Sequence, residues 1–110
     1  MHHQEEREAD VQRAILDYLT LRGIFRYRNT SGAFVFPETA THKRRFSKAG
    51  VVGAPSIVGV IKRQYVGIEC KATKERQSEN QKEFQKRLED AGGLYILAYS
   101  IDDVALRLAA

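Results

Sequence analysis

Two β-rich runs separated by only two residues constrain most strongly what this chain can fold into. The runs span residues 56–62 and 65–71, and only Arg63 and Gln64 lie between them. Strand-forming runs this close together predict a tight antiparallel hairpin. The turn lacks the Asn-Gly pair that fixes the register of many hairpins, so the register has to be assumed.

The assumed register pairs Lys62 with Tyr65. Ser56 then lies opposite Lys71, and Glu69, two residues before Lys71, shares that face of the hairpin. A carboxylate, an ammonium group and a hydroxyl therefore gather at one end of the hairpin. The other face carries four apolar residues that we expect in the core: Ile57, Ile61, Ile68 and Cys70.

Periodic apolar residues and end signals predict three helices. Apolar residues at helical spacing predict the first over residues 8–22. The second, over residues 78–91, begins with Ser78 and Gln81, the two members of a capping box. A short terminal helix is expected over residues 101–108.

The rest of the chain predicts two further strands and one long loop. Residues 24–28 alternate apolar and basic side chains, and residues 94–99 form a short apolar run. Residues 33–54 lack periodicity and are expected to form a loop with one short strand over residues 33–36. The order of elements predicts an α/β fold with a central mixed β-sheet flanked by α-helices.

Length and composition limit the class of protein. With 110 residues, the chain is expected to form one domain, preceded by an unstructured start over residues 1–7. Its 43% hydrophobic residues exclude intrinsic disorder. The longest mostly apolar stretch, residues 51–61, is too short to span a membrane. Its single cysteine excludes an internal disulfide and a cysteine-rich zinc site. We therefore expect a cytoplasmic protein.

Basic residues are concentrated in one segment of the chain. The net charge is +4, and residues 22–48 hold seven basic side chains against the single acidic Glu38. Such a block could attract nucleic-acid phosphates, or it could be a solvated basic loop. The seven are Arg22, Arg26, Arg28, Lys43, Arg44, Arg45 and Lys48.

Glu69 and Lys71 interrupt an otherwise apolar strand, and such charges are rarely buried unless they are paired. One interpretation is an ion pair on a solvated sheet face. The other is a metal site, in which the Glu69 carboxylate and the backbone carbonyl of Cys70 offer oxygen ligands to Mg²⁺ or Mn²⁺. Lys71 could then orient a water molecule or stabilise charge on a phosphate.

The spacing of these residues resembles a known nuclease motif. The run Gly-Ala-Pro-Ser ends at Ser56, thirteen residues before Glu69 of Glu-Cys-Lys, and this resembles the PD-(D/E)xK motif. Four other segments resemble the virus-type replication-repair nuclease (VRR-NUC) domain of the stand-alone phage and bacterial type. The resemblance covers the chain from Glu8 to Val104. The four segments are residues 8–12, 28–32, 76–81 and 91–93.

The resemblance implies a restriction-endonuclease-like fold and metal-dependent hydrolysis of DNA phosphodiesters. It also implies a homodimer that acts on branched DNA such as four-way (Holliday) junctions, in a bacterial or phage-infected cell. The implied cofactor is Mg²⁺ or Mn²⁺.

The resemblance also implies roles for individual residues. Glu69 and the Cys70 carbonyl would be metal ligands, and Lys71 would be the catalytic lysine. Glu8 would be a supporting acidic ligand, although it could equally be an ordinary acidic residue near a helix N-terminus. Gln81 would help to align the site, although it is also the expected capping partner of Ser78.

Ser56 departs from the family pattern, which has an acidic residue directly after the proline. A serine hydroxyl supplies no charge to balance a divalent cation. Three explanations stay open: an inactivated nuclease, a natural variant that recruits another acid, or a non-catalytic DNA-binding module on the same fold. The basic segment is expected to contact DNA through six residues: Arg28, Asn29, Lys43, Arg44, Arg45 and Lys48.

Overall fold

The computed structural model describes residues 7–29, 32–36, 38–41, 45–49 and 51–109, with only the backbone described in 32–36 and 45–49. Along these residues the chain forms helices α1 (Glu8–Leu21), α2 (Glu79–Asp90) and α3 (Ile101–Leu108). It also forms strands β1 (Phe25–Arg28), β2 (Gly32–Phe36), β3 (Arg45–Ala49), β4 (Ile57–Ile61), β5 (Gln64–Cys70) and β6 (Leu94–Ala98). No helix in these described ranges is long and apolar enough to cross a membrane.

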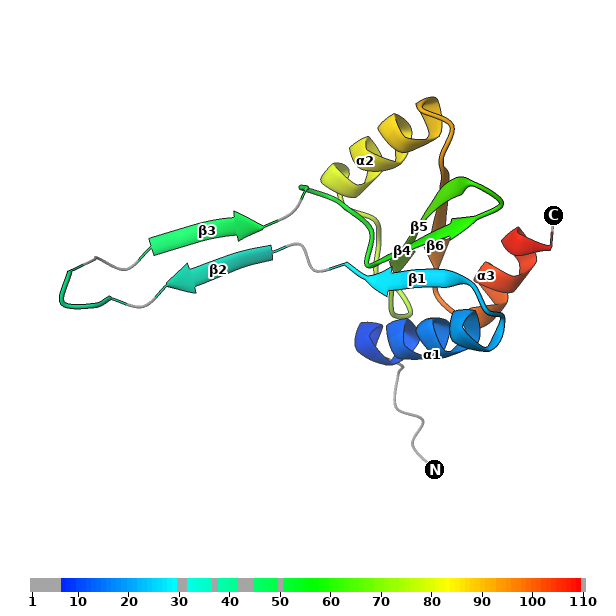
Figure 1. Ribbon diagram of the computed structural model, residues 1–110, viewed down its shortest axis with the longest axis horizontal. Helices are drawn as coiled ribbons and strands as arrows, with labels where there is room; N and C mark the ends of the chain where they lie inside the picture. Colours follow the sequence, from blue (N-terminus) through cyan, green and yellow to red (C-terminus); the bar gives the residue numbers. More distant parts are fainter. Residues whose placement is uncertain (1–6, 30–31, 37, 42–44, 50, 110) are drawn as a thin grey trace.

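The central sheet has the strand order β1-β4-β5-β6. The β1–β4 and β4–β5 pairs are antiparallel, whereas β5 and β6 are parallel. Helices α1 and α3 lie on one side of this sheet and α2 lies on the other (Figure 1). The predicted α/β fold, a mixed sheet flanked by helices, is confirmed.

The core lies between the sheet and the pair α1 and α3. Val11, Ile15 and Leu19 recur at helical spacing on α1 and are fully buried. The apolar face of the hairpin meets them as predicted, with Ile57, Ile68 and Cys70 buried and Ile61 partly buried against the same cluster. Alternation along the hairpin therefore predicted correctly which face enters the core.

The predicted register of the hairpin is wrong, because the turn begins one residue earlier than assumed. The turn consists of Lys62 and Arg63, with φ of 49° and 69°, and Ile61 pairs with Gln64. Both central residues of this two-residue turn adopt positive φ, which matches the right-handed twist of the strands although neither is glycine or asparagine. Continued along the ladder, the observed register places Ser56 opposite Glu69 and no longer opposite Lys71. The error shifts the pairing by two positions, so the faces are unchanged.

The predicted loop over residues 33–54 contains more structure than expected. Strand β2 extends the predicted strand at residues 33–36, and β3 was not predicted. The two pair only with each other among the described strands and project from the body as an arm (Figure 1). A two-stranded ribbon needs no continuous apolar face against a core, so β3 lacks the alternation by which strands are recognised.

Helix ends follow the predicted signals closely. Helix α1 ends before Gly23, which has φ of 68° and so adopts the left-handed conformation that glycine favours. The capping box of α2 is confirmed, since the backbone N–H of Gln81 donates to Ser78 Oγ at 3.1 Å and that of Ser78 donates to Gln81 Oε1 at 2.8 Å. At α3, Ser100 makes no capping hydrogen bond, and Asp103 accepts one from the Tyr99 N–H.

Candidate functional site

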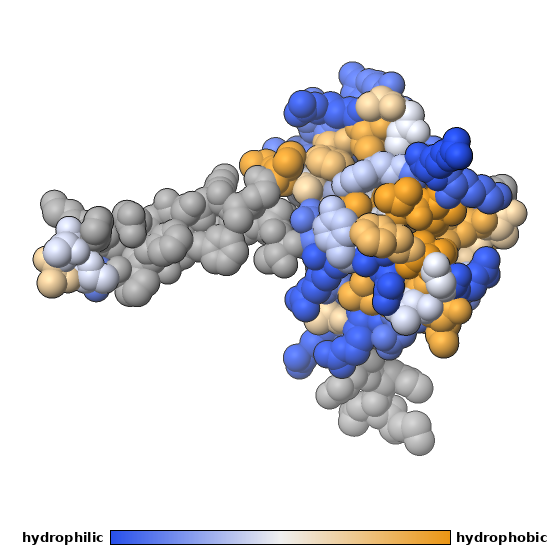
Figure 2. Space-filling view, viewed as in Figure 1, coloured by the Kyte–Doolittle hydropathy of each residue, from blue (hydrophilic) through white to orange (hydrophobic). Residues whose placement is uncertain are grey.

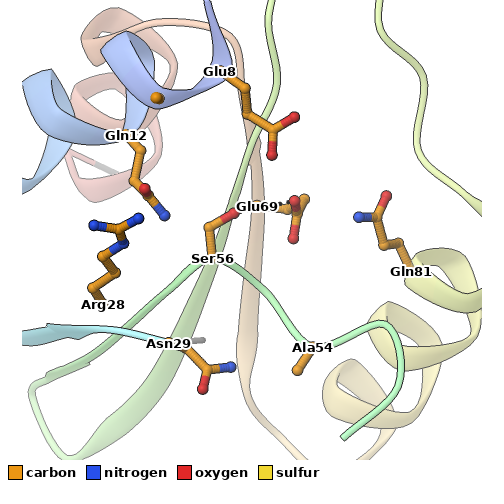
Figure 3. Close-up of a pocket in the computed structure, with 9 residues that line it drawn as sticks. Glu8, Gln12, Arg28, Asn29, Ala54, Ser56, Glu69 and Gln81 are labelled. Carbon is orange, nitrogen blue, oxygen red and sulfur yellow. Dashed lines mark hydrogen bonds between the residues drawn. The ribbon is translucent and has the colours of Figure 1, made fainter. Parts of the chain in front are cut away.

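A cavity of about 390 Å³ opens where the N-terminal ends of α1 and α2 meet the start of β4 and the end of β5. Figure 3 shows Glu8, Glu69 and Gln81 directing their polar ends toward the same space. The lining is mostly polar and comes from five parts of the chain. It consists of Glu8, Ala9, Gln12, Arg28, Asn29, Ala54, Ser56, Glu69 and Gln81.

Ser56 and Glu69 are joined directly at the centre of this cavity. The Ser56 hydroxyl donates to Glu69 Oε1 over 3.1 Å and accepts from the Cys70 backbone N–H over 3.3 Å. These bonds follow from the observed register, which puts Ser56 at the position opposite Glu69. The serine hydroxyl therefore bridges the two strands at the centre of the cavity.

Glu69 is a buried carboxylate, with only 3% of its surface exposed. Its pKa is raised from 4.5 to about 7, mainly by burial and to a smaller extent by the charge of Glu8. The hydrogen bond from Ser56 and the charge of Lys71 lower the pKa but do not offset the burial. The negative charge of Glu69 is thus incompletely compensated by the groups around it.

Lys71 lies beside the two carboxylates and does not line the cavity. It is 8% exposed, and its positive charge lowers the pKa of both Glu8 and Glu69. The interpretation of Glu69 and Lys71 as an ion pair on a solvated sheet face is therefore wrong, because both side chains are buried. Helix α2 and the segment before it cover this end of the sheet.

Glu8 faces the cavity from the first residue of α1. Burial raises its pKa, as do a hydrogen bond with the Glu75 carboxyl and the charge of Glu75. Glu75 is held in place because its carboxylate accepts from the Ala72 N–H at 3.1 Å and its carbonyl accepts from the Tyr99 hydroxyl at 2.8 Å. The sequence analysis missed Glu75, which lies in an irregular segment whose path no periodic pattern indicates.

Gln81 performs both of the roles considered for it. Its side-chain oxygen caps the first turn of α2, and the same side chain lines the cavity. The segment before β4 approaches α2 closely here, since a side chain at Gly53 would overlap the backbone of Asn80. Gln12 also borders the cavity, from the second turn of α1.

Arg28 and Asn29, two of the predicted DNA-contacting residues, line the side of the cavity nearest β1. Asn29 has a structural role, because its Nδ2 donates to the Pro55 carbonyl at 3.1 Å and its backbone N–H donates to the Ser56 carbonyl at 2.8 Å. Arg28 is exposed at the end of β1. Only Arg28 of this pair therefore has a side chain available for an anionic ligand.

The other predicted DNA contacts are Lys43, Arg44, Arg45 and Lys48. Lys43 and Arg44 are outside the described residues. Arg45 and Lys48 belong to β3, where only the backbone is described. Cys70 points into the core, and burial raises the pKa of its thiol to about 12, so the thiol stays protonated and only its backbone carbonyl can serve as a ligand.

The donor atoms in the cavity fit a hard divalent cation in their chemistry. The Glu8 and Glu69 carboxylates supply oxygen atoms and negative charge that no nearby cation fully balances. Among the described residues, however, no three His, Cys, Asp or Glu side chains are placed to hold a metal ion together. The cavity therefore offers a metal two carboxylates, with the neutral Ser56 between the strands.

Comparison with known proteins gives no relative of this chain: no family model, no curated protein and no solved structure matches it.

Proposed function

We propose that this chain is a metal-dependent DNA endonuclease that hydrolyses phosphodiester bonds and is impaired by Ser56. The observation that carries the proposal is the burial of Glu69 beside Lys71 and Ser56, with Glu8 across the same cavity. Burying charged groups at a strand end destabilises the fold, so such a cluster is more typical of a catalytic site than of a structural one.

The residues at the cavity have distinct roles in this proposal. A bound Mg²⁺ or Mn²⁺ would activate water and stabilise negative charge on the phosphate. Glu69, Glu8 and the backbone carbonyl of Cys70 would hold the cation. Lys71 would stabilise charge that develops on the phosphate, and its burial keeps its charge unscreened by water. Gln81 would align the site from the first turn of α2.

Ser56 limits this activity. The serine replaces one negative charge by a hydroxyl that already binds Glu69 and the Cys70 N–H. Changes at positions that only support metal ligands lower metal affinity or activity by about 10- to 100-fold, and a missing ligand should cost at least as much. We therefore expect weak metal binding and slow cleavage.

The proposed substrate is branched DNA, with a four-way junction as the expected form. A symmetric dimer would place two such cavities on a two-fold symmetric substrate, which suits paired cuts. The arm and the apolar end of the chain, which includes the exposed Leu106 of α3, are the expected contact regions between copies.

A non-catalytic DNA-binding module on the same fold is the second candidate. It is favoured by the same Ser56 hydrogen bonds, because they join Glu69 and the Cys70 N–H without a cation.

The substitution Ser56→Asp separates these candidates. With Mn²⁺ and a labelled four-way junction, we expect Ser56→Asp to cleave at least about 10- to 100-fold faster than the chain with Ser56. Ser56→Asn, which matches the aspartate in size but adds no charge, should stay as slow as the chain with Ser56. If Ser56→Asp binds DNA but cleaves no branched, flapped or linear substrate with either metal, the non-catalytic module is the correct interpretation.

A further inference from the structure

Large apolar side chains remain exposed on the sheet face that α2 incompletely covers. Phe25 and Tyr27 on β1 lie opposite Val60 and Val58 of β4, and Val60 lies opposite Tyr65 of β5. Residues directly opposed across an antiparallel pair share a face. We call Phe25, Tyr27, Val60 and Tyr65 the aromatic platform. Figure 2 shows apolar side chains gathered over the strands between α2 and α1.

The aromatic platform is open to solvent. Phe25 is 65% exposed, Tyr27 50%, Val60 45% and Tyr65 37%. Helix α2 packs on β6, and its Leu88 reaches the sheet at Gly67, so no helix of the described residues covers Phe25 and Val60. The Phe25 and Tyr27 rings meet edge to face with centroids 6.4 Å apart, an arrangement that aromatic pairs prefer.

The area of the aromatic platform argues against a second copy of this chain as its partner. With about 200 Å² for each aromatic side chain, the exposed fractions amount to roughly 400 Å² of apolar surface. A stable protein–protein interface buries about 800 Å² on each partner. A patch of roughly 400 Å² is instead the size of a functional patch on a monomer, and its rings suit flat ligands of similar size.

The charges around the aromatic platform favour an anionic ligand. Segments 22–29 and 57–68, which carry the platform, contain no acidic residue. Lys62 and Arg63 are exposed at the hairpin turn, next to Val60 and Tyr65. Basic residues beside exposed aromatic rings are the combination that binds single-stranded nucleic acid, with bases stacked on the rings and phosphates near the cations. Arg22, Arg26 and Arg28 lie on the α1 side of the sheet, where Arg22 and Arg26 donate to Tyr18 and Thr20. Lys62 and Arg63 are therefore the cations beside the platform.

The aromatic platform lies on the same face of the sheet as the polar cavity. Ser56 and Val60 are four residues apart on one side of β4, and Glu69 and Tyr65 are four apart on β5. At about 3.3 Å per residue, roughly 13 Å separates the two rows. Between the two rows Val58 is buried, and Pro55 and Leu88 cover Gly67, so a nucleic-acid strand that contacts both has to pass around these side chains.

We propose that the aromatic platform binds unpaired bases of a nucleic-acid strand by stacking. Its role in cleavage rests on the function proposed above: the platform would hold a single-stranded segment of a strand that continues into the cavity. The substrate class is thereby branched DNA with unpaired nucleotides near the cleaved bond, which a flap offers and a fully paired four-way junction does not. Three rings accommodate two or three bases.

Binding of single-stranded DNA without a metal tests the aromatic platform separately from catalysis. Fluorescence anisotropy would measure the affinity of the full chain for a labelled oligothymidylate in EDTA. Loss of one stacked base lowers affinity about 5- to 150-fold, so we expect Phe25→Ala and Tyr65→Ala each to weaken binding by that factor. The control Leu21→Ala removes an 88% exposed apolar side chain from α1 and should leave affinity unchanged.

Two further measurements make the outcome decisive. Phe25→Tyr keeps a ring and should bind as tightly as the unsubstituted chain. Phe25→Leu keeps apolar bulk without a ring and should bind as weakly as Phe25→Ala. Circular dichroism of each variant detects any folding defect. Equal affinity of Phe25→Ala, Tyr65→Ala and the natural chain would overturn the proposal. So would a dimer, seen by sedimentation, that Phe25→Ala dissociates. The binding assay measures no cleavage, so a negative result would overturn the platform without deciding whether the chain is a nuclease. Likewise, a negative result with Ser56→Asp would not decide whether the platform binds bases.

Discussion

Glu69→Gln should make the protein more stable at neutral and alkaline pH and leave its acid stability nearly unchanged. Burial raises the pKa of Glu69 from its ordinary value of 4.5 to about 7 in the folded chain. Between these values the folded state binds more protons than the unfolded state, so stability falls as the pH rises from 4.5 through 7. The shift amounts to at most about 3 kcal/mol at ~1.4 kcal/mol per pKa unit. Glutamine keeps an oxygen acceptor for the Ser56 hydroxyl and carries no charge.

Urea unfolding followed by circular dichroism at pH 4 and pH 8, in EDTA, measures this effect. The difference in unfolding free energy between Glu69→Gln and the natural chain should grow by up to about 3 kcal/mol from the lower to the higher pH. Glu83→Gln removes an exposed carboxylate from α2 and should show no comparable change. A constant difference for Glu69→Gln across the pH range would mean that Glu69 is ionised in the fold at little cost, and the argument from its burial would be refuted.

Two other predictions concern packing and charge. Gly67→Ala should lower the unfolding free energy by about 1–3 kcal/mol in the same assay, because the new Cβ would lie 2.6 Å from the ring of Pro55. An unchanged unfolding free energy would show that Pro55 can move away. Alanine at Arg44, Arg45 and Lys48, three basic residues of the segment 22–48, should reduce the slope of log affinity for duplex DNA against log salt by up to about 3, since each phosphate contact contributes about 0.9. An unchanged slope would mean that these three residues do not contact DNA.

Much of the fold could be predicted because it follows from local periodicity. The spacing of Val11, Ile15 and Leu19 gave α1 and its buried face, and the pair Ser78 and Gln81 gave the start of α2. The register of the hairpin could not be predicted, since the turn at Lys62 and Arg63 has no residue that marks positive φ. Ordinary side chains there adopt a conformation that the pairing of the strands imposes.

The candidate site could be predicted only in part. Alternation along the strands placed Ser56, Glu69 and Lys71 on one face, and this depends only on the period of two. The burial of Glu69 and Lys71, and the approach of Glu75 to Glu8, depend on how separate segments pack against the sheet. No local pattern carries that information, so the sequence alone does not exclude an ion pair of Glu69 and Lys71 on a solvated sheet face.

The hydrogen bonds of Asn29 have a consequence for how this protein tolerates change. The arm leaves the body after Asn29 and returns before Pro55, and the Asn29 side chain and backbone join these two points. The base of the arm is therefore closed independently of its length. Strands β2 and β3 can lengthen, shorten or exchange sequence while Ser56 keeps its position, so the reach of the arm and the chemistry of the cavity can evolve separately.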